Sequence, residues 1–105
     1  MKITLLCALG MSTSLLVERM KKVANEREIN VEIEAYSADD IDKHVETANV
    51  ILLGPQIRYK KNELFKKAKA ANTPIEIIDM RAYGSTDGEK VLDQALDLMN
   101  YTREE

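Results

Sequence analysis

The sequence predicts an α/β fold in which helices cover both faces of a parallel sheet. Short apolar segments alternate along the chain with longer segments whose apolar residues recur every three or four positions. Such alternation is typical of parallel sheets, because each helix carries the chain back across the sheet. The 105 residues suffice for one domain with its own core, and 45% of them are hydrophobic. We therefore expect a single domain over residues 1–105, with its last few residues frayed.

Four short segments are rich in β-branched and apolar residues, and we expect each to be a strand. They lie at 2–7, 31–36, 49–53 and 74–78. The first and third are almost continuously apolar, as is usual for strands that are covered on both faces. The second alternates polar and apolar residues, which is compatible with a place at the edge of the sheet.

Helical periodicity follows each strand. We expect helices over about 14–27, 37–47, 57–71 and 88–99. A serine or threonine at 12–14 is a natural N-cap for the first helix. Its inward stripe is expected to contain Leu16, Met20, Val23 and Arg27, with Leu15 and Ala24 beside it. The connection over 79–84 is expected to be a loop, in which Asp79 caps a turn or binds backbone amides.

Composition excludes several classes of protein. The single cysteine, Cys7, excludes an internal disulfide, a zinc cluster of several thiolates and a CxxC redox pair, and it fits a reducing cytosol. The net charge of −3 argues against a nucleic-acid partner. No apolar run approaches the roughly 20 residues that span a bilayer, so we expect no direct membrane insertion. Nothing in the sequence calls for a metal or another cofactor.

Cys7 ends the first predicted strand, directly before a loop that opens a helix. The backbone N–H groups of this loop can converge on the sulfur and, with the positive end of the helix dipole, stabilise an anion there. Such a loop suits a thiolate nucleophile and a phosphoryl group carried on its sulfur, although a buried and inert cysteine is the alternative. We predict Cys7 as the catalytic residue. The predicted phosphate-binding loop comprises Ala8, Leu9, Gly10, Met11, Ser12, Thr13 and Ser14.

The same loop lacks the arginine of a cysteine-dependent phosphatase. That class places an arginine six residues after the nucleophile, where this chain has Thr13, and the next arginine is Arg19. Walker and dinucleotide-binding glycine patterns are also absent. Fast hydrolysis needs a phosphate clamp, a positioned water and a general acid. The loop therefore favours a phosphoryl carrier, while a small cysteine phosphatase and a non-catalytic regulatory module of the same fold stay open as alternatives.

Three segments carry a family resemblance. The chain contains LLCALGMSTSLL at 5–16, LLGPQIRY at 52–59, and a third group at Ile78-Asp79, Tyr83-Gly84 and Asp87-Gly88. These segments resemble the enzyme IIB components of the sugar phosphotransferase system (PTS), lactose/cellobiose family. The likeness extends to about Asn100, and the first segment favours the cellobiose-type branch.

The resemblance implies a three-layer α-β-α fold with a four-stranded parallel sheet, similar to that of small cysteine phosphatases. It implies that Cys7 accepts a phosphoryl group from a phosphohistidine on enzyme IIA. The group then passes to a sugar, such as cellobiose or another β-linked disaccharide, bound by the membrane permease enzyme IIC. The protein would be a cytoplasmic phosphotransferase that associates peripherally with the permease. Since the donor is another protein, the sulfur is expected to be accessible.

Further residues are candidates for supporting roles. Gln56, Tyr59 and Tyr83 are expected at the active edge of the sheet, where they could orient the phosphoryl group or contact a partner; a helix cap and buried tyrosine rings are the alternatives. The only histidine, His44, lies in a polar segment and is expected to be a solvated surface residue. Between positions 58 and 69 there are six lysines and arginines and one acid, a charge run that could steer docking or form a solvated helix face.

Overall fold

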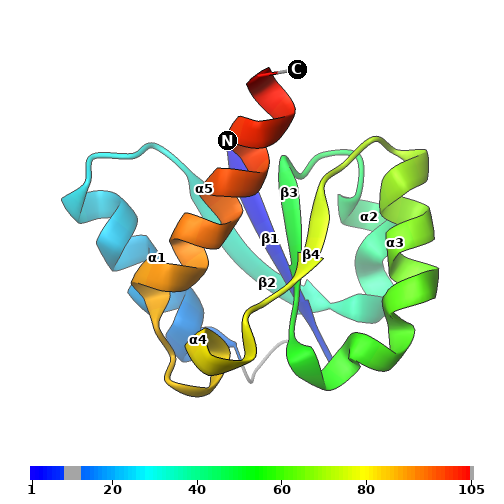
Figure 1. Cartoon of the computed structure of the whole chain (residues 1–105), viewed down its shortest axis with the longest axis horizontal. Coiled ribbons are helices and arrows are strands. Elements are labelled where there is room, and N and C mark those ends of the chain that lie inside the picture. The colour runs from blue at the N-terminus through cyan, green and yellow to red at the C-terminus, as the bar shows by residue number, and fades with distance from the viewer. Residues whose placement is uncertain (9–12, 105) are drawn as a thin grey trace.

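The chain folds around a four-stranded parallel sheet (Figure 1). A computed structural model describes residues 1–8 and 13–104, with side chains through Met99. The strands are β1 (Lys2–Cys7), β2 (Glu32–Ser37), β3 (Val50–Leu53) and β4 (Ile75–Ile77). Their order in the sheet is β2-β1-β3-β4, and every neighbouring pair is parallel. The predicted α/β fold with a four-stranded parallel sheet is confirmed, and β2 lies at an edge as its alternating pattern suggested.

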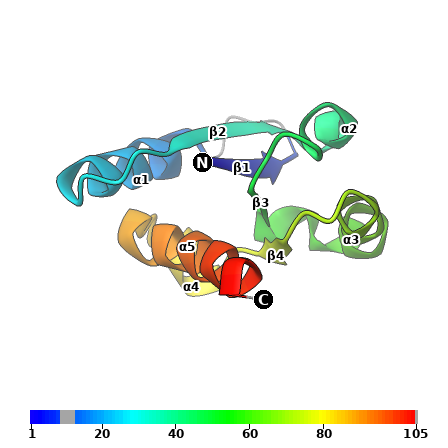
Figure 2. The same cartoon turned by 90° about the horizontal axis from the view of Figure 1, so that it is seen from above.

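Helices form a layer on each face of the sheet. Helices α1 (Ser14–Glu26) and α5 (Gly88–Glu104) lie side by side, while α2 (Ile41–His44) and α3 (Lys61–Ala70) lie on the other side (Figure 2). The strands alternate between the two layers. In β1, Leu5 packs into the core that includes α1 and α5, and its neighbour Leu6 packs into the core that includes α2 and α3. Both leucines are fully buried, so the register of β1 is fixed from both faces.

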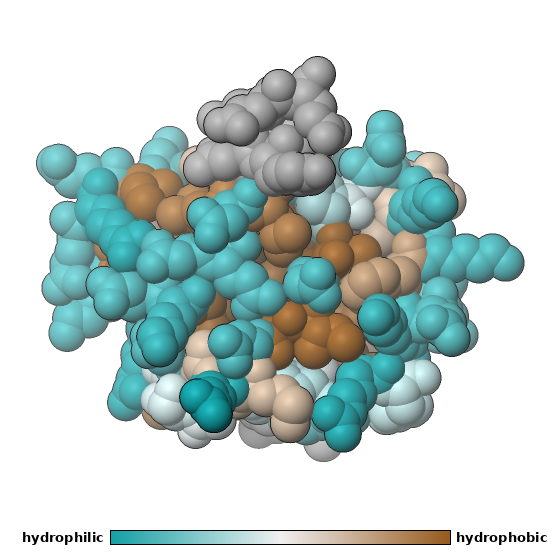
Figure 3. All heavy atoms as spheres, viewed as in Figure 1, coloured by the Kyte–Doolittle hydropathy of each residue, from teal (hydrophilic) through white to brown (hydrophobic). Residues whose placement is uncertain are grey.

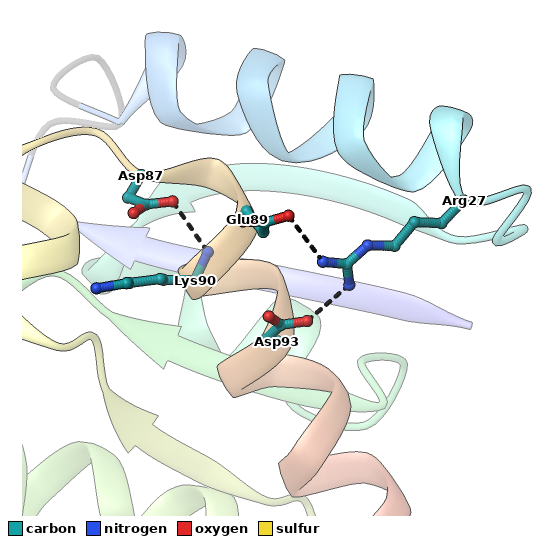
Figure 4. A network of polar contacts seen from close by, with 5 residues as sticks. All are labelled: Arg27, Asp87, Glu89, Lys90 and Asp93. Atoms are coloured by element: carbon teal, nitrogen blue, oxygen red, sulfur yellow. Dashed lines mark hydrogen bonds and ion pairs between the residues drawn. The ribbon is translucent and has the colours of Figure 1, made fainter.

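Helices α1 and α5 are joined by a polar network at the surface (Figure 4). Arg27, just after α1, donates hydrogen bonds to Asp93 at 2.6 Å and to Glu89 at 3.3 Å, both on α5. The two carboxylates raise the pKa of Arg27. Asp87 caps the start of α5 by accepting a hydrogen bond from the Lys90 backbone N–H at 3.1 Å. Arg27 therefore faces a helix rather than the core into which its expected stripe would point.

Two short elements differ from the sequence-based expectation. The residues after β4 form a helix, α4 (Met80–Gly84), instead of a loop. Its N-cap is Asp79, whose side chain accepts a hydrogen bond from the Arg81 backbone N–H at 2.9 Å. The capping role of Asp79 is thus confirmed. The expected helix over 37–47 is shorter: a 3₁₀ turn, η1 (Ala38–Asp40), leads into α2, which ends at His44. A second 3₁₀ segment, η2 (Pro55–Lys60), precedes α3.

The outer edge of β4 is covered by side chains at Ile77. The Ile78 backbone N–H donates to Leu53 of β3, so the polar groups of Ile77 face the opposite way, out of the sheet. There the Ile77 N–H donates to the Glu76 side chain at 3.0 Å, and the Ile77 carbonyl accepts from the Gln94 amide at 2.8 Å. Gln94 also accepts from the Asp79 backbone N–H at 3.1 Å. Helix α5 is in this way fastened to the edge strand.

The strand order creates a switch point between β1 and β3. The chain leaves β1 towards the α1 layer and leaves β3 towards the α3 layer, so the connections diverge at the carboxyl ends of these strands. Ligands of parallel α/β sheets bind in the crevice that such divergence opens. Cys7 ends β1 at this point, and Gly54 directly follows β3. In Figure 1 this edge of the sheet is at the bottom.

Candidate active site at the carboxyl edge of the sheet

Cys7 lies at the end of β1 and is fully buried. Its Sγ is 3.6 Å from the hydroxyl oxygen of Thr13 and 4.0 Å from the backbone carbonyl oxygen of Tyr36, to which the thiol donates. The expectation of an accessible sulfur is wrong for this conformation of the chain.

Thr13 is the N-cap residue of α1, within the predicted positions 12–14. Its side chain makes no capping hydrogen bond and lies instead beside the Cys7 sulfur. Like Cys7, Thr13 is fully buried. The hydroxyl that local sequence assigns to helix capping is thus directed at the thiol.

The predicted phosphate-binding loop is only partly described. Ala8 and Ser14, its first and last residues, are exposed, and Thr13 contacts Cys7. Four of its residues lie outside the described part of the chain, namely Leu9, Gly10, Met11 and Ser12. The anion-binding role of the loop amides stays a prediction.

Gln56 and Tyr83 meet at this edge, as expected of residues that follow β3 and β4. The Gln56 amide nitrogen donates to the Tyr83 hydroxyl at 2.5 Å. The Gln56 amide oxygen lies over the buried Gly54, 2.7 Å from where a Cβ on that glycine would stand. The same Cβ position is 3.6 Å from Cys7 Cβ, which places the Gln56 amide close to the cysteine. The third candidate, Tyr59, is 76% exposed.

The rim of this edge carries exposed apolar and cationic side chains. Leu15 at the start of α1 and Met80 at the start of α4 are both more than half exposed. Arg58 of η2 places a guanidinium nitrogen 3.5 Å from the Met80 sulfur. Met80 and Arg58 thus join α4 to η2 at the same end of the sheet.

The basic run over 58–69 is partly neutralised within the chain. Lys60 pairs with Asp39 at 3.3 Å, and Lys67 pairs with Asp42 at 3.1 Å. The hydrogen bond that Lys60 donates to the Asp39 carboxylate raises the pKa of Lys60. Sequence reasoning missed these pairs because the acids lie more than 20 residues away, in η1 and α2. Exposed pairs of this kind contribute little to stability, but they lower the charge available to a docking partner.

His44 is not the solvated residue that its polar neighbours suggested. Its ring stacks on Tyr36 with centroids 3.7 Å apart and planes 16° from parallel, and the residue is half-buried. Burial lowers the pKa of His44, and the positive charge of Lys2 lowers that pKa further. The end of α2 thus packs against the Tyr36 ring, and the Tyr36 carbonyl is the one that contacts Cys7.

The His44 environment predicts a pH-dependent stability. Because the pKa is lower in the folded chain than its ordinary value of about 6.5, the unfolded chain binds the proton more readily. The free energy of unfolding should therefore fall as pH drops below about 6.5 and level off below the folded pKa. Urea unfolding between about pH 7.5 and pH 5 measures this slope. A His44→Phe variant keeps an aromatic stack and should lose the slope; an unchanged slope in that variant would assign it to other groups.

An apolar groove near the amino ends of the strands is separate from this site. It has a volume of about 420 Å³ and lies near the amino end of β4, between α3 and α5. Its apolar lining comes from Phe65, Pro74, Ile75 and Leu98. Figure 3 shows the apolar surface between α3 and α5. The groove contains none of the residues that surround Cys7.

Among residues 1–8 and 13–104, no group of three or more His, Cys, Asp or Glu side chains is placed to hold a metal ion. Within the same described ranges, no helix has the length and apolar character needed to cross a membrane.

Comparison with known proteins connects this site to a family. Residues 2–94 match the family described as PTS system, Lactose/Cellobiose specific IIB subunit. The chain belongs to this family. Its phosphotransferase character follows, since IIB components are the phosphotransferase domains of the sugar phosphotransferase system.

Individual relatives cover nearly the whole chain. The oligo-beta-mannoside-specific EIIB component of Bacillus subtilis is 46% identical over 93% of this IIB chain and 95% of its own length. The galactose-specific EIIB component of Lactococcus lactis subsp. cremoris is 47% identical over the same shares. The solution structure of a cellobiose-specific IIB component from Borrelia burgdorferi is 42% identical, with a TM-score of 0.84 over 97% of this chain and 94% of that one.

The expected likeness to small cysteine phosphatases holds for the fold. The structure of YwlE arginine phosphatase superposes with a TM-score of 0.54 over 98% of this IIB chain and 91% of the phosphatase, at 11% identity. The two proteins share an architecture in which the chain turns from a central strand into a helix at the carboxyl edge of the sheet. At this identity the comparison concerns the fold alone.

Proposed function

We propose that this IIB protein carries a phosphoryl group on the sulfur of Cys7 between two partner proteins. The observation that supports the proposal is the position of Cys7 at the switch point, with the Thr13 hydroxyl 3.6 Å from Sγ where a phosphatase has its arginine. A hydroxyl can donate to the sulfur or to a phosphoryl oxygen without clamping the group for attack by water. Such a site suits holding and passing on a phosphoryl group.

The first transfer loads Cys7. The thiol releases its proton, and the thiolate sulfur attacks the phosphorus of a phosphohistidine on enzyme IIA. The S–P bond forms as the P–N bond breaks, and the imidazole leaves with the bonding electron pair. Catalysis of such an in-line displacement depends on positioning and on stabilising charge, which the loop from Ala8 to Ser14 would supply through its amides and hydroxyls.

The second transfer removes the phosphoryl group from Cys7. A sugar hydroxyl held by the permease enzyme IIC attacks the phosphorus and gives up its proton to solvent, the O–P bond forms, and the P–S bond breaks to return the thiolate of Cys7. The protein would act in the cytoplasm, associated peripherally with the permease. We propose that Tyr59, which is exposed, contacts a partner, and that Gln56 and Tyr83, which are hydrogen-bonded to each other, act on the phosphoryl group.

We propose a β-linked disaccharide such as cellobiose as the sugar. The cellobiose-specific structural relative and the LLCALGMSTSLL segment support this choice. Other relatives are specific for oligo-beta-mannosides and for galactose at similar identity. Sugar uptake by a strain that lacks this protein, complemented with the protein, tests the choice: restored uptake of galactose but not of cellobiose would contradict it.

Phosphorylation in a reconstituted system tests the carrier function. The protein is incubated with phosphoenolpyruvate and the purified upstream phosphotransfer proteins, including enzyme IIA, and its intact mass is measured. We expect a gain of one phosphoryl group, located on Cys7 by peptide mapping and absent when enzyme IIA is omitted. Steady, Cys7-dependent turnover of p-nitrophenyl phosphate would favour the phosphatase alternative. Absence of any mass gain would favour a non-catalytic module.

A further inference from the structure

Gly54 lies beside Cys7 and is itself buried. Gly54 follows β3 directly, and its Cβ position would stand 3.6 Å from Cys7 Cβ. A residue without a side chain normally leaves its neighbour open to solvent, but here both Gly54 and Cys7 are buried. Another group must therefore fill the space that the missing side chain leaves.

The Gln56 side chain fills this space. Its amide oxygen lies 2.7 Å from the Cβ position of Gly54, a separation too short for a real Cβ. Gln56 is itself exposed, and its amide packs against the buried Gly54 next to Cys7. An alanine at position 54 would force the amide away from this place. The glycine thus permits the glutamine to turn back towards the cysteine.

Tyr83 holds the Gln56 amide in this position. The hydrogen bond to the Tyr83 hydroxyl is short, at 2.5 Å, and connects η2 to α4. The Tyr83 ring is half-buried against the core that includes α1 and α5. The hydroxyl is therefore a fixed point on the fold, whereas the Gln56 side chain is flexible and attached to a 3₁₀ segment.

We propose that Gln56 and Tyr83 form a gate over Cys7, and that Gln56 binds the phosphoryl group when the gate opens. Opening exchanges one hydrogen bond for another: the Gln56 Nε2–H bond to Tyr83 Oη breaks, and the same N–H donates to a phosphoryl oxygen on the sulfur. A bond to a charged acceptor is stronger than a neutral one, which favours the open arrangement only when the phosphoryl group is present. This inference rests on the proposed carrier function, but the closed gate can be tested without it.

The rate at which iodoacetamide alkylates Cys7 in the unphosphorylated protein measures how far the closed gate limits access to the sulfur. Gln56→Ala removes the cover, and Tyr83→Phe removes the bond that holds it; each is expected to raise the alkylation rate about fivefold to tenfold. Gln56→Glu can still accept a hydrogen bond from the Tyr83 hydroxyl and should alkylate at close to the wild-type rate. Asn62→Ala, which removes an exposed amide from α3, should have no effect.

Arg27→Ala is the control for general destabilisation. It removes the ion pairs between Arg27 and α5, which lie away from the gate. The urea midpoint of unfolding is measured for both variants. If Arg27→Ala lowers the midpoint as much as Tyr83→Phe does and raises the alkylation rate equally, the gate proposal is wrong. It is equally wrong if Gln56→Ala and Tyr83→Phe both alkylate at the wild-type rate.

Phosphorylation separates the two roles of Gln56. Gln56→Ala is expected to open the gate but to lower the rate of phosphoryl transfer about tenfold, because the phosphoryl group loses one donor. Gln56→Glu should keep the gate closed and also lose transfer, because its carboxylate repels the phosphoryl group. Phosphoryl transfer at the wild-type rate in both variants would show that Gln56 does not bind the phosphoryl group. If the wild-type protein is never phosphorylated while Gln56→Ala still alkylates faster, the carrier function fails and the gate stands.

Discussion

The Cys7→Ala variant is expected to gain no phosphoryl group under conditions that fully load the wild-type protein. Alanine removes the nucleophilic sulfur, and losing the nucleophile lowers the rate of such a transfer by at least about a thousandfold. The fold should survive, because deleting one buried sulfur atom costs only about 1 kcal/mol of the free energy of unfolding. Intact mass after incubation with enzyme IIA measures the effect. Loading of Cys7→Ala at the wild-type rate would show that another residue is the carrier.

Thr13→Val provides a graded comparison with the loss of the sulfur. Valine keeps the shape of the buried side chain but removes the hydroxyl that lies 3.6 Å from Cys7 Sγ. The phosphoryl group or the thiolate then loses one hydrogen bond to a charged atom, which lowers the transfer rate about tenfold to a hundredfold. The same mass measurement over time resolves this intermediate rate. A Thr13→Val protein that transfers at the wild-type rate would restrict Thr13 to a packing role.

The Gly88→Ala variant is expected to lose about 3 kcal/mol of the free energy of unfolding. Gly88 is the first residue of α5 and is buried against α1. A Cβ there would stand 2.6 Å from the Arg19 carbonyl carbon and 2.8 Å from the Met20 backbone nitrogen. Backbone atoms cannot turn aside as a side chain can, so α1 and α5 would have to separate. Urea unfolding monitored by circular dichroism measures the loss.

Gly84→Ala is the matched control for this substitution. Gly84 ends α4, and a Cβ at that position meets no atom within 4 Å. Alanine in a helix is favoured over glycine, so the free energy of unfolding should stay equal or rise by up to about 1 kcal/mol. Equal losses in Gly88→Ala and Gly84→Ala would mean that the close approach of α5 to α1 does not limit stability.

The strands could be predicted to within about one residue because their residues leave little choice. The segment from Val50 to Leu53 is buried on both faces, and only a central parallel strand accommodates such a run. The meeting of Cys7, Gln56 and Tyr83 at one edge also follows from the sequence, since parallel strands end on the same side. Their contacts do not follow from it, because side-chain hydrogen bonds between distant segments depend on how the helices pack.

Elements without periodicity were harder to predict. Helix α4 has five residues, too few for an apolar repeat, and its only local signal is the cap at Asp79. The prediction of the inward face of α1 was partly wrong, since Leu15 is 52% exposed while Val17 is buried in the core. His44 was misplaced because its neighbours along the chain are polar, whereas its neighbour in space is the Tyr36 ring. For His44, a contact between residues distant in sequence decided the structure.

The hydrogen bonds that occupy the outer edge of β4 at Ile77 have a consequence for the proposed carrier function. Exposed strand edges tend to recruit further strands, and such contacts are slow to release. Here the Glu76 carboxylate and the Gln94 amide already occupy the polar groups of Ile77 that a new strand would need. The polar groups of Ile77 are thereby unavailable to a further strand, which suits the proposed carrier function because each contact with a partner would have to be brief. A carrier that must leave each partner quickly benefits when backbone groups at its sheet edge are already hydrogen-bonded within the chain.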